Sequence, residues 1–183
     1  MGKIIRFDKM GGDFMGSAAM TMTKNDKLNT SDTATIFDVA NYFINKSDEE
    51  NLMTPLKLQK ICYYAQAWSL VWEGKELFHE DFQAWPHGPA NYDLFKIYQG
   101  QRYIDNTLVE CNYKIFNEEQ IETLEIVWEA YGKYSGDYLE QLTHQEDPWI
   151  KTRDNLSPGD KCNRIIKKDI IKEYYESLNA EEE

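Results

Sequence analysis

One continuous helical pattern, residues 54–72, constrains the fold of this 183-residue chain more than any other feature. Thr54 is suited to cap the helix, and Pro55 fits the first helical position, where its missing N–H costs nothing. An apolar stripe recurs every three or four residues, and further apolar side chains widen it, so other elements must cover this helix on more than one side. We therefore expect it at the centre of the domain, ending at Gly74. The stripe consists of Leu58, Ile61, Cys62, Ala65, Trp68 and Trp72, and its flank of Tyr63, Tyr64 and Leu70.

Shorter stretches with helical apolar spacing flank this central helix on both sides. The best start signal is the capping box formed by Asn117 and Gln120. Short extended segments are expected at 82–85 and 165–166, and weak alternation over 107–116 predicts a small strand or hairpin. The predicted fold class is mainly α, a compact single domain of helices with minor short β elements. The further helices are expected to start at Asp32 or Thr33, Asn91 or Asp93, Asn117, Ser135, Asp147 and Asp169.

The two ends of the chain differ in composition from its middle. Residues 1–31 are rich in Gly, Met, Thr, Asn and Lys and show no helix or strand period, which predicts a flexible leader. Residues 32–179 form the predicted helical domain, and residues 180–183 form an acidic tail.

The charge and the cysteines limit the possible partners and the compartment. A net charge of −12 disfavours direct binding to nucleic-acid phosphates, and it serves either general solubility or encounter with a basic partner. No apolar run approaches the ~20 residues needed to span a bilayer, so no membrane association is expected. Cys62, Cys111 and Cys162 are far apart, which indicates reduced thiols and a cytoplasmic location.

The residue types that catalysis needs are present but not arranged for it. The histidines, His79, His87 and His144, show no metal-binding spacing, and the alternative for His144 is a place near a helix carbonyl end, where a cation is favoured. Cys62 lies on the apolar stripe, which favours an inert buried thiol. No phosphate-binding glycine loop or nucleophile elbow occurs. We therefore predict a non-enzymatic protein without cofactor or metal.

Three aromatic residues are candidates for a partner-binding surface. Trp85, His87 and Trp149 stand beside prolines in predicted turns. An aromatic side chain in such a turn either packs into the core or anchors an interface with a partner.

The central helix carries further candidates. Lys57 and Lys60, three residues apart, are predicted near its polar side, either as a solvated face or as groups that pair with carboxylates. Tyr63 and Tyr64 are adjacent and cannot point the same way, so one of them is expected to reach a groove. Trp68 lies on the core stripe.

Three blocks, taken in order, resemble the Panacea domain family, which includes SocA-type antitoxins and phage-associated GepA-like proteins. Residues 53–68 (MTPLKLQKICYYAQAW) are similar to its signature helix. Residues 82–89 (FQAWPHGP) are similar to its AW-x-x-GP turn, and residues 131–149 to its YG…LTH…PW stretch. The resemblance covers residues 33–178, with one departure: residues 90–93 (ANYD) stand where the family usually has Val and a further proline.

The resemblance implies a mostly helical fold and the antitoxin role of a toxin–antitoxin pair, in which the protein binds its cognate toxin directly. It implies no catalytic residues. Two alternatives remain open: an adaptor that delivers a toxin to a Clp-type protease, and a phage or mobile-element anti-defence protein whose acidic surface mimics nucleic acid. The motif and possible partner-binding residues are Pro55, Lys57, Gln59, Lys60, Tyr63, Tyr64, Trp68, Trp85, His87, Gly88, Pro89, His144, Pro148 and Trp149.

Overall fold

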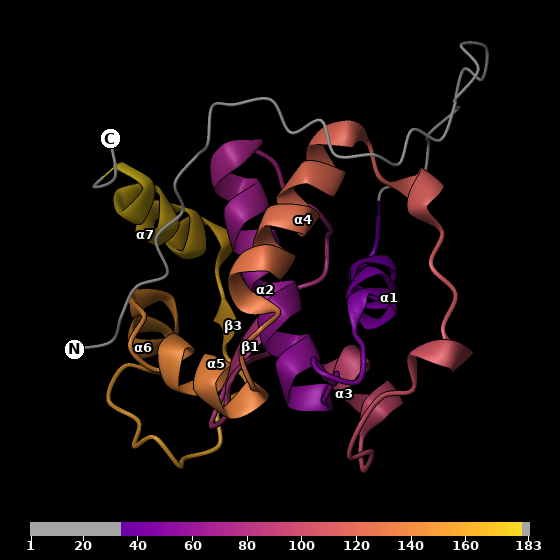
Figure 1. The fold of residues 1–183 in the computed structure, drawn as a ribbon. Helices are drawn as coiled ribbons and strands as arrows, with labels where there is room; N and C mark the ends of the chain where they lie inside the picture. The colour runs from indigo at the N-terminus through magenta and orange to yellow at the C-terminus, as the bar shows by residue number, and fades with distance from the viewer. Residues whose placement is uncertain (1–33, 181–183) are drawn as a thin grey trace.

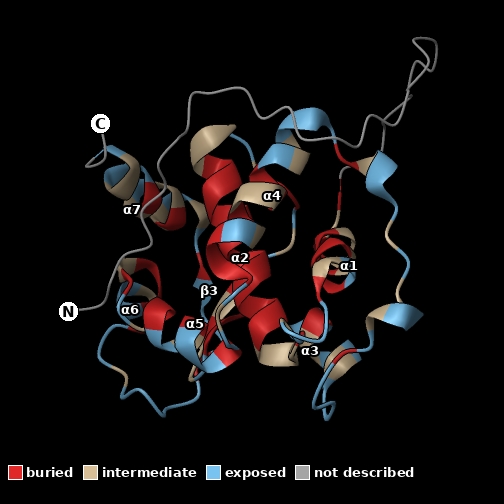
Figure 2. Cartoon of the chain, in the orientation of Figure 1, coloured by how far each residue is buried: buried red, intermediate tan, exposed pale blue. Residues whose placement is uncertain are grey.

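Helix α2 (Pro55–Trp72) passes through the middle of the molecule in the computed structural model, which describes residues 34–180 (Figure 1). The Thr54 side chain accepts a hydrogen bond from the backbone N–H of Lys57, and Pro55 lies in the first turn, as predicted. Every residue from Lys57 to Leu70 is buried, and Figure 2 shows α2 as buried along most of its length. The expectation of a central helix is confirmed.

Helices surround α2 on several sides and bury its whole circumference. Helices α1, α3, α4, α5 and α7 all contact it directly, and α6 packs on α7 and on the small sheet. The fold is mainly α with minor β, as expected from the sequence. The surrounding helices are α1 (Ile36–Lys46), α3 (Tyr92–Tyr98), α4 (Glu118–Tyr131), α5 (Gly136–Thr143), α6 (Asp147–Arg153) and α7 (Lys168–Ala180).

The sheet has three short antiparallel strands in the order β2-β1-β3. Strands β1 (Phe82–Trp85) and β3 (Ile165–Ile166) confirm the two predicted extended segments. Strand β2 (Gly88–Ala90) was expected to be part of a turn, but the turn is confined to Pro86 and His87. Trp85 pairs with Gly88 at the closed end of this hairpin, and β2 packs against α2.

Most of the predicted caps are present. Asn91, Asn117 and Ser135 cap α3, α4 and α5 through their side chains, and Asn117 forms the predicted capping box with Gln120. Short polar side chains are effective here because they bond the free N–H groups of a first helical turn.

Three predicted helix starts are wrong. Helix α1 is capped by Thr35, in a box with Asp38, and neither Asp32 nor Thr33 is its cap. Asp147 is the first residue of α6, and the N-cap position belongs to Glu146, whose side chain makes no capping bond because it is engaged in the core. Helix α7 starts at Lys168, one residue before the predicted Asp169.

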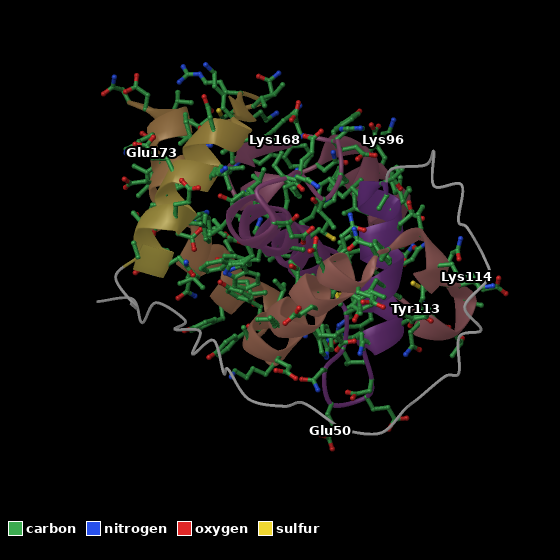
Figure 3. All side chains as sticks on the ribbon, turned by 90° about the horizontal axis from the view of Figure 1, so that it is seen from above. Glu50, Lys96, Tyr113, Lys114, Lys168 and Glu173 are labelled. Carbon is green, nitrogen blue, oxygen red and sulfur yellow. The ribbon has the colours of Figure 1, made fainter. Side chains whose placement is uncertain are left out.

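The predicted strand or hairpin over 107–116 is also wrong. The segment holds two 3₁₀ turns, η1 (Asn106–Leu108) and η2 (Tyr113–Ile115). The side chains of Asp105 and Asn112 accept backbone N–H groups two residues later, so each turn is closed locally. Figure 3 shows Tyr113 and Lys114 on the side of the molecule opposite Glu173 of α7.

The predicted leader, residues 1–31, and residues 181–183 of the predicted tail lie outside the described residues. Within 34–180, none of the helices has the length and apolarity that crossing a bilayer would require.

Candidate functional site

A pocket of about 510 Å³ opens between the first turns of α2, the hairpin, α3 and α5. We call it the α2–α3–α5 pocket. Its exposed surface is mostly apolar, and polar and charged side chains border it, which is the usual character of a ligand or partner site. The lining residues are Pro55, Leu56, Gln59, Lys60, Trp85, His87, Gly88, Ala90, Leu94, Phe95, Tyr98, Asp137, Glu140 and Gln141.

Lys60 forms the buried base of this pocket, with only 1% of its surface exposed. Its ammonium donates a hydrogen bond of 3.0 Å to the carbonyl oxygen of Pro89. Burial lowers the pKa of Lys60 from its usual 10.5 to about 7, although the field of the Glu140 carboxylate acts in the opposite direction. The base of the pocket therefore holds an amine that is easily charged or discharged near neutral pH.

Gly88 makes room for the Lys60 side chain. Its φ of +88° lies in the region that other residues rarely adopt. A Cβ at this position would lie 2.6 Å from Thr143 Oγ1 and 2.9 Å from Lys60 Nζ. The glycine of the predicted GP turn therefore has a packing role at the base of the pocket.

Gln59 ties the hairpin and α3 to α2. Its side-chain oxygen accepts from the backbone N–H of Asn91 at 2.7 Å, and its nitrogen donates to the carbonyl oxygen of the same residue at 3.0 Å. The Asn91 side chain in turn caps α3 by accepting from Leu94 N. A two-point bond between a buried amide and the backbone fixes one face of the pocket in place.

The walls and the rim of the pocket differ in character. Trp85 and Phe95 meet edge to face, with ring centroids 5.1 Å apart, and form an apolar wall. At the rim, His87 Nδ1 lies 3.0 Å from Glu140 Oε1, and Asp137 is exposed nearby on the same helix.

A second ionisable group, Glu146, is buried in the core without opening into this pocket. Tyr64 and Tyr175 donate hydrogen bonds to its two carboxylate oxygens at 3.0 and 2.8 Å. Burial raises the pKa of Glu146 to about 8, although these two hydrogen bonds oppose the change. Tyr64 also stacks on Tyr131, with centroids 3.9 Å apart.

The closing motif residues support the hairpin from behind. Trp149 Nε1 donates to the carbonyl oxygen of Trp85 at 2.8 Å, and its ring stacks on His144 at 4.1 Å. Arg153 lies 4.8 Å from the same ring, and its guanidinium donates to four backbone carbonyls. Pro148 is buried in the first turn of α6. These residues form scaffold under the pocket.

Lys57, the other predicted cation of α2, is also buried but faces away from the pocket. Its ammonium donates to the carbonyl oxygen of Gly132 at 2.5 Å and lies 5.5 Å from the Trp128 ring centroid. This places a cation at the carbonyl end of α4, where the helix dipole favours it.

The structure corrects three interpretations of these residues. The polar, solvated side proposed for Lys57 and Lys60 is wrong, because both are buried and bonded to carbonyls of distant segments. Neither Tyr63 nor Tyr64 reaches a groove, because both are buried in the core. His144 is at the C-cap of α5, but burial lowers its pKa, which disfavours the predicted cation.

Six of the predicted residues meet in the pocket, and the others lie beneath or away from it. The pocket residues are Pro55, Gln59, Lys60, Trp85, His87 and Gly88. The residues outside the pocket are Lys57, Tyr63, Tyr64, Trp68, Pro89, His144, Pro148 and Trp149. Trp68 is buried and donates a hydrogen bond to the Tyr131 hydroxyl. Sequence reasoning missed the contributions of α3 and α5, namely Leu94, Phe95, Tyr98, Asp137, Glu140 and Gln141.

The titratable side chains offer no evident metal site in the described part of the chain. No group of three or more His, Cys, Asp or Glu residues is placed to hold an ion there. Cys62 is buried and its thiol pKa is raised by burial, which disfavours a nucleophilic thiolate.

The family model described as "Antitoxin SocA-like, Panacea domain" matches residues 58–150. This segment holds most of α2, the hairpin, α3, α4, α5 and the start of α6, and so it includes nearly all of the pocket. The match spans about half of the chain, and the chain belongs to this family of antitoxin-like domains. No curated protein and no solved structure gives a match.

Proposed function

We propose that this protein is an antitoxin that neutralises a cognate toxin by direct binding, and that the toxin contacts it at the α2–α3–α5 pocket. The observation that carries the proposal is that family motif blocks far apart in the sequence meet at one pocket. Three family blocks separated in the sequence, residues 53–68, 82–89 and 131–149, contribute side chains to one pocket, and Trp149 of the third block also supports the hairpin from below. The protein acts by binding rather than by catalysis.

The pocket has the properties of a preformed binding site. Its volume of about 510 Å³ lies within the ~300–1,000 Å³ that is common for such sites. The bonds of Gln59 to the Asn91 backbone and of Lys60 to Pro89 O in the hairpin hold its frame in place before any partner arrives. An apolar side chain that enters such a pocket gains about 1.5–3 kcal/mol from burial.

The test is growth rescue by co-expression with the toxin, which we expect to be encoded by an adjacent gene. Wild-type protein should restore growth and form a stable complex on gel filtration. Gln141→Arg places a long side chain at the exposed rim of the pocket and should abolish rescue. Gln145→Arg adds the same charge four residues later, at an exposed position just past the end of α5 and outside the lining, and should rescue fully. Equal rescue by both variants would exclude the pocket as the contact site.

Delivery of the bound toxin to a Clp-type protease is an extension of this proposal. The segments suggested for protease contact, the leader and the acidic tail, lie mostly outside the described residues. The measurement is toxin lifetime during co-expression: it should lengthen in a strain that lacks the protease, and an unchanged lifetime would exclude the adaptor role.

A second candidate function, an anti-defence protein that mimics nucleic acid, is favoured by the surface of α4. This helix carries five glutamates and no Lys or Arg. Glu118, Glu119, Glu122 and Glu129 are exposed on it. Replacing Glu118 and Glu122 by Lys should abolish protection of an infecting phage if this role is correct, and unchanged protection would exclude it.

We place the action of the protein in the cytoplasm. Its three cysteines are free thiols, two of them buried, which supports a reducing compartment. Fractionation of cells that express the tagged protein tests this placement.

A further inference from the structure

The Lys60 ammonium retains binding capacity in the free protein. An ammonium has three N–H donors, and the one hydrogen bond it makes within residues 34–180 goes to Pro89 O. Within the same residues it forms no ion pair, although it is almost completely buried. A buried charge in this state is stabilised strongly by an anionic oxygen that comes within hydrogen-bond distance.

The pocket places this donor beneath apolar walls and an acidic rim. Leu56, Leu94 and Phe95 supply apolar lining, and Asp137 and Glu140 supply carboxylates on the α5 side. Charge complementarity therefore requires a ligand with three parts: an anionic oxygen at its tip, apolar groups behind the tip, and positive charge where it leaves the pocket.

We propose that the pocket captures the C-terminus of the toxin, with the terminal carboxylate on Lys60, the last apolar side chains between α2 and α3, and an upstream basic residue beside Asp137. This inference rests on the proposed antitoxin function and names the part of the partner that is bound. A chain end carries its carboxylate and its last side chain on one Cα, so both can enter a single pocket that has a buried lysine and apolar walls.

An internal Asp or Glu of the partner fits the same pocket less well. The backbone would have to enter and leave past the acidic rim, and neighbouring acidic residues would be repelled by Asp137 and Glu140. A chain end has only one strand of backbone to accommodate. The C-terminus is therefore the source of the carboxylate that the observations favour.

The pKa of Lys60, about 7, supports this assignment, because the cost of burying its charge outweighs the field of the Glu140 carboxylate in the free protein. A bound carboxylate should raise this pKa. The change is measurable on the full-length protein from the pH titration of the Lys60 side-chain carbons by NMR.

The binding test uses synthetic hexapeptides that begin with Gly-Lys-Lys-Ala and end in every pair of Leu, Ile, Val, Met and Phe. Each is made as the free acid and as the C-terminal amide, and a third series carries an internal Glu and an amide end. At least one free acid should bind about tenfold more tightly than its amide, because only the acid offers a charged oxygen to the Lys60 ammonium. Its binding should raise the Lys60 pKa.

Two variants of buried lysines on the same helix separate recognition from folding. Lys60→Met should remove the preference for the free acid. Lys57→Met should retain it, because Lys57 is buried on another side of α2 and bonds to Gly132 O. The acid and amide comparison on wild-type protein does not depend on whether either variant folds.

Three results would overturn the inference. Equal affinity for acid and amide would show that no carboxylate is recognised, and equal affinity for the internal-Glu series would reject the chain end. No saturable binding of any peptide up to about 5 mM would reject capture of a chain end by this pocket. Failure of the proposed function is distinguishable from all three, because it appears as equal growth rescue by the Gln141 and Gln145 variants.

Discussion

Glu146 and Lys60 are both buried ionisable residues whose pKa values lie near neutral, at about 8 and about 7, but their surroundings differ. Both carboxylate oxygens of Glu146 accept a tyrosine hydroxyl, and the group is enclosed by core. Lys60 makes one bond to a carbonyl and borders a pocket. A buried ionisable group that is bonded on both oxygens within the core stabilises the fold, whereas a buried amine with unused N–H donors beside a pocket is able to bind a partner.

The largest change in the free energy of unfolding is predicted for a substitution of Gly88, which is tightly packed against Lys60 at the base of the pocket. Gly88→Ala should lower the free energy of unfolding by about 2–5 kcal/mol, because it combines strain at φ +88° with contacts to Thr143 and Lys60. Chemical denaturation measures the change. Gly100→Ala is the control, since Gly100 has a similar φ of +82° but open space around its Cβ. It should cost only about 1–2 kcal/mol. Equal losses would mean that the Lys60 side chain moves aside easily.

A second substitution tests whether the hydrogen bonds of Glu146 stabilise the fold. Tyr64→Phe removes one hydroxyl from a carboxylate oxygen and should lower the free energy of unfolding by about 1–3 kcal/mol. Tyr138→Phe, at a partly exposed tyrosine of α5, should change it by less than about 0.5 kcal/mol. If the two variants are equally stable in urea denaturation, the carboxylate does not depend on its tyrosine partners.

The pH dependence of stability tests whether Glu146 is protonated in the folded state. The pKa of Glu146 rises from 4.5 in the unfolded chain to about 8 in the fold, so the folded state binds more protons between these values. Stability therefore falls as pH rises through this window, by up to roughly 1.4 kcal/mol per pH unit from this one group. Glu146→Gln should remove that part of the slope, measured as the difference between the two proteins at pH 5, 6, 7 and 8. Parallel curves for wild type and variant would contradict a buried, protonated carboxyl.

The smallest expected effect on stability is at Lys60. Lys60→Met removes a buried charge that has no ion pair and fills a similar volume, so the free energy of unfolding at pH 7 should stay within about 1 kcal/mol of wild type or rise. Toxin binding should nevertheless weaken. A loss of more than about 3 kcal/mol in thermal or urea denaturation would make Lys60 a structural residue like Glu146 and remove the distinction between the two sites.

The sequence was sufficient to predict elements whose signals are local. The capping residues Thr54, Asn117 and Ser135 and the apolar stripe of α2 predicted helices that the structure contains. The segment over 107–116 was misassigned because weak alternation resembles a strand, whereas the side chains of Asp105 and Asn112 close turns instead.

The environment of the site was not predictable from local patterns. Lys57 and Lys60 have the spacing of a solvated face. They are buried instead, with hydrogen bonds to the carbonyl oxygens of Gly132 and Pro89, which lie 75 and 29 residues away in the sequence. The walls from α3 and α5 come together with α2 only through tertiary packing. Among the pocket residues, Pro55, Lys60, Trp85 and His87 were singled out from local patterns and Gln59 and Gly88 from the family resemblance, but neither source predicted that they lie together.

The dissociation constant of the complex with the toxin, compared for two matched variants, tests directly whether the α2–α3–α5 pocket binds the toxin. Phe95→Ser removes an aromatic wall of the pocket, and Leu108→Ser removes a side chain that is 81% exposed on η1, outside the pocket lining. We predict about a tenfold or greater loss of affinity for Phe95→Ser and wild-type affinity for Leu108→Ser by isothermal titration calorimetry. Wild-type affinity for Phe95→Ser, with loss for Leu108→Ser, would contradict the claim that the α2–α3–α5 pocket binds the toxin.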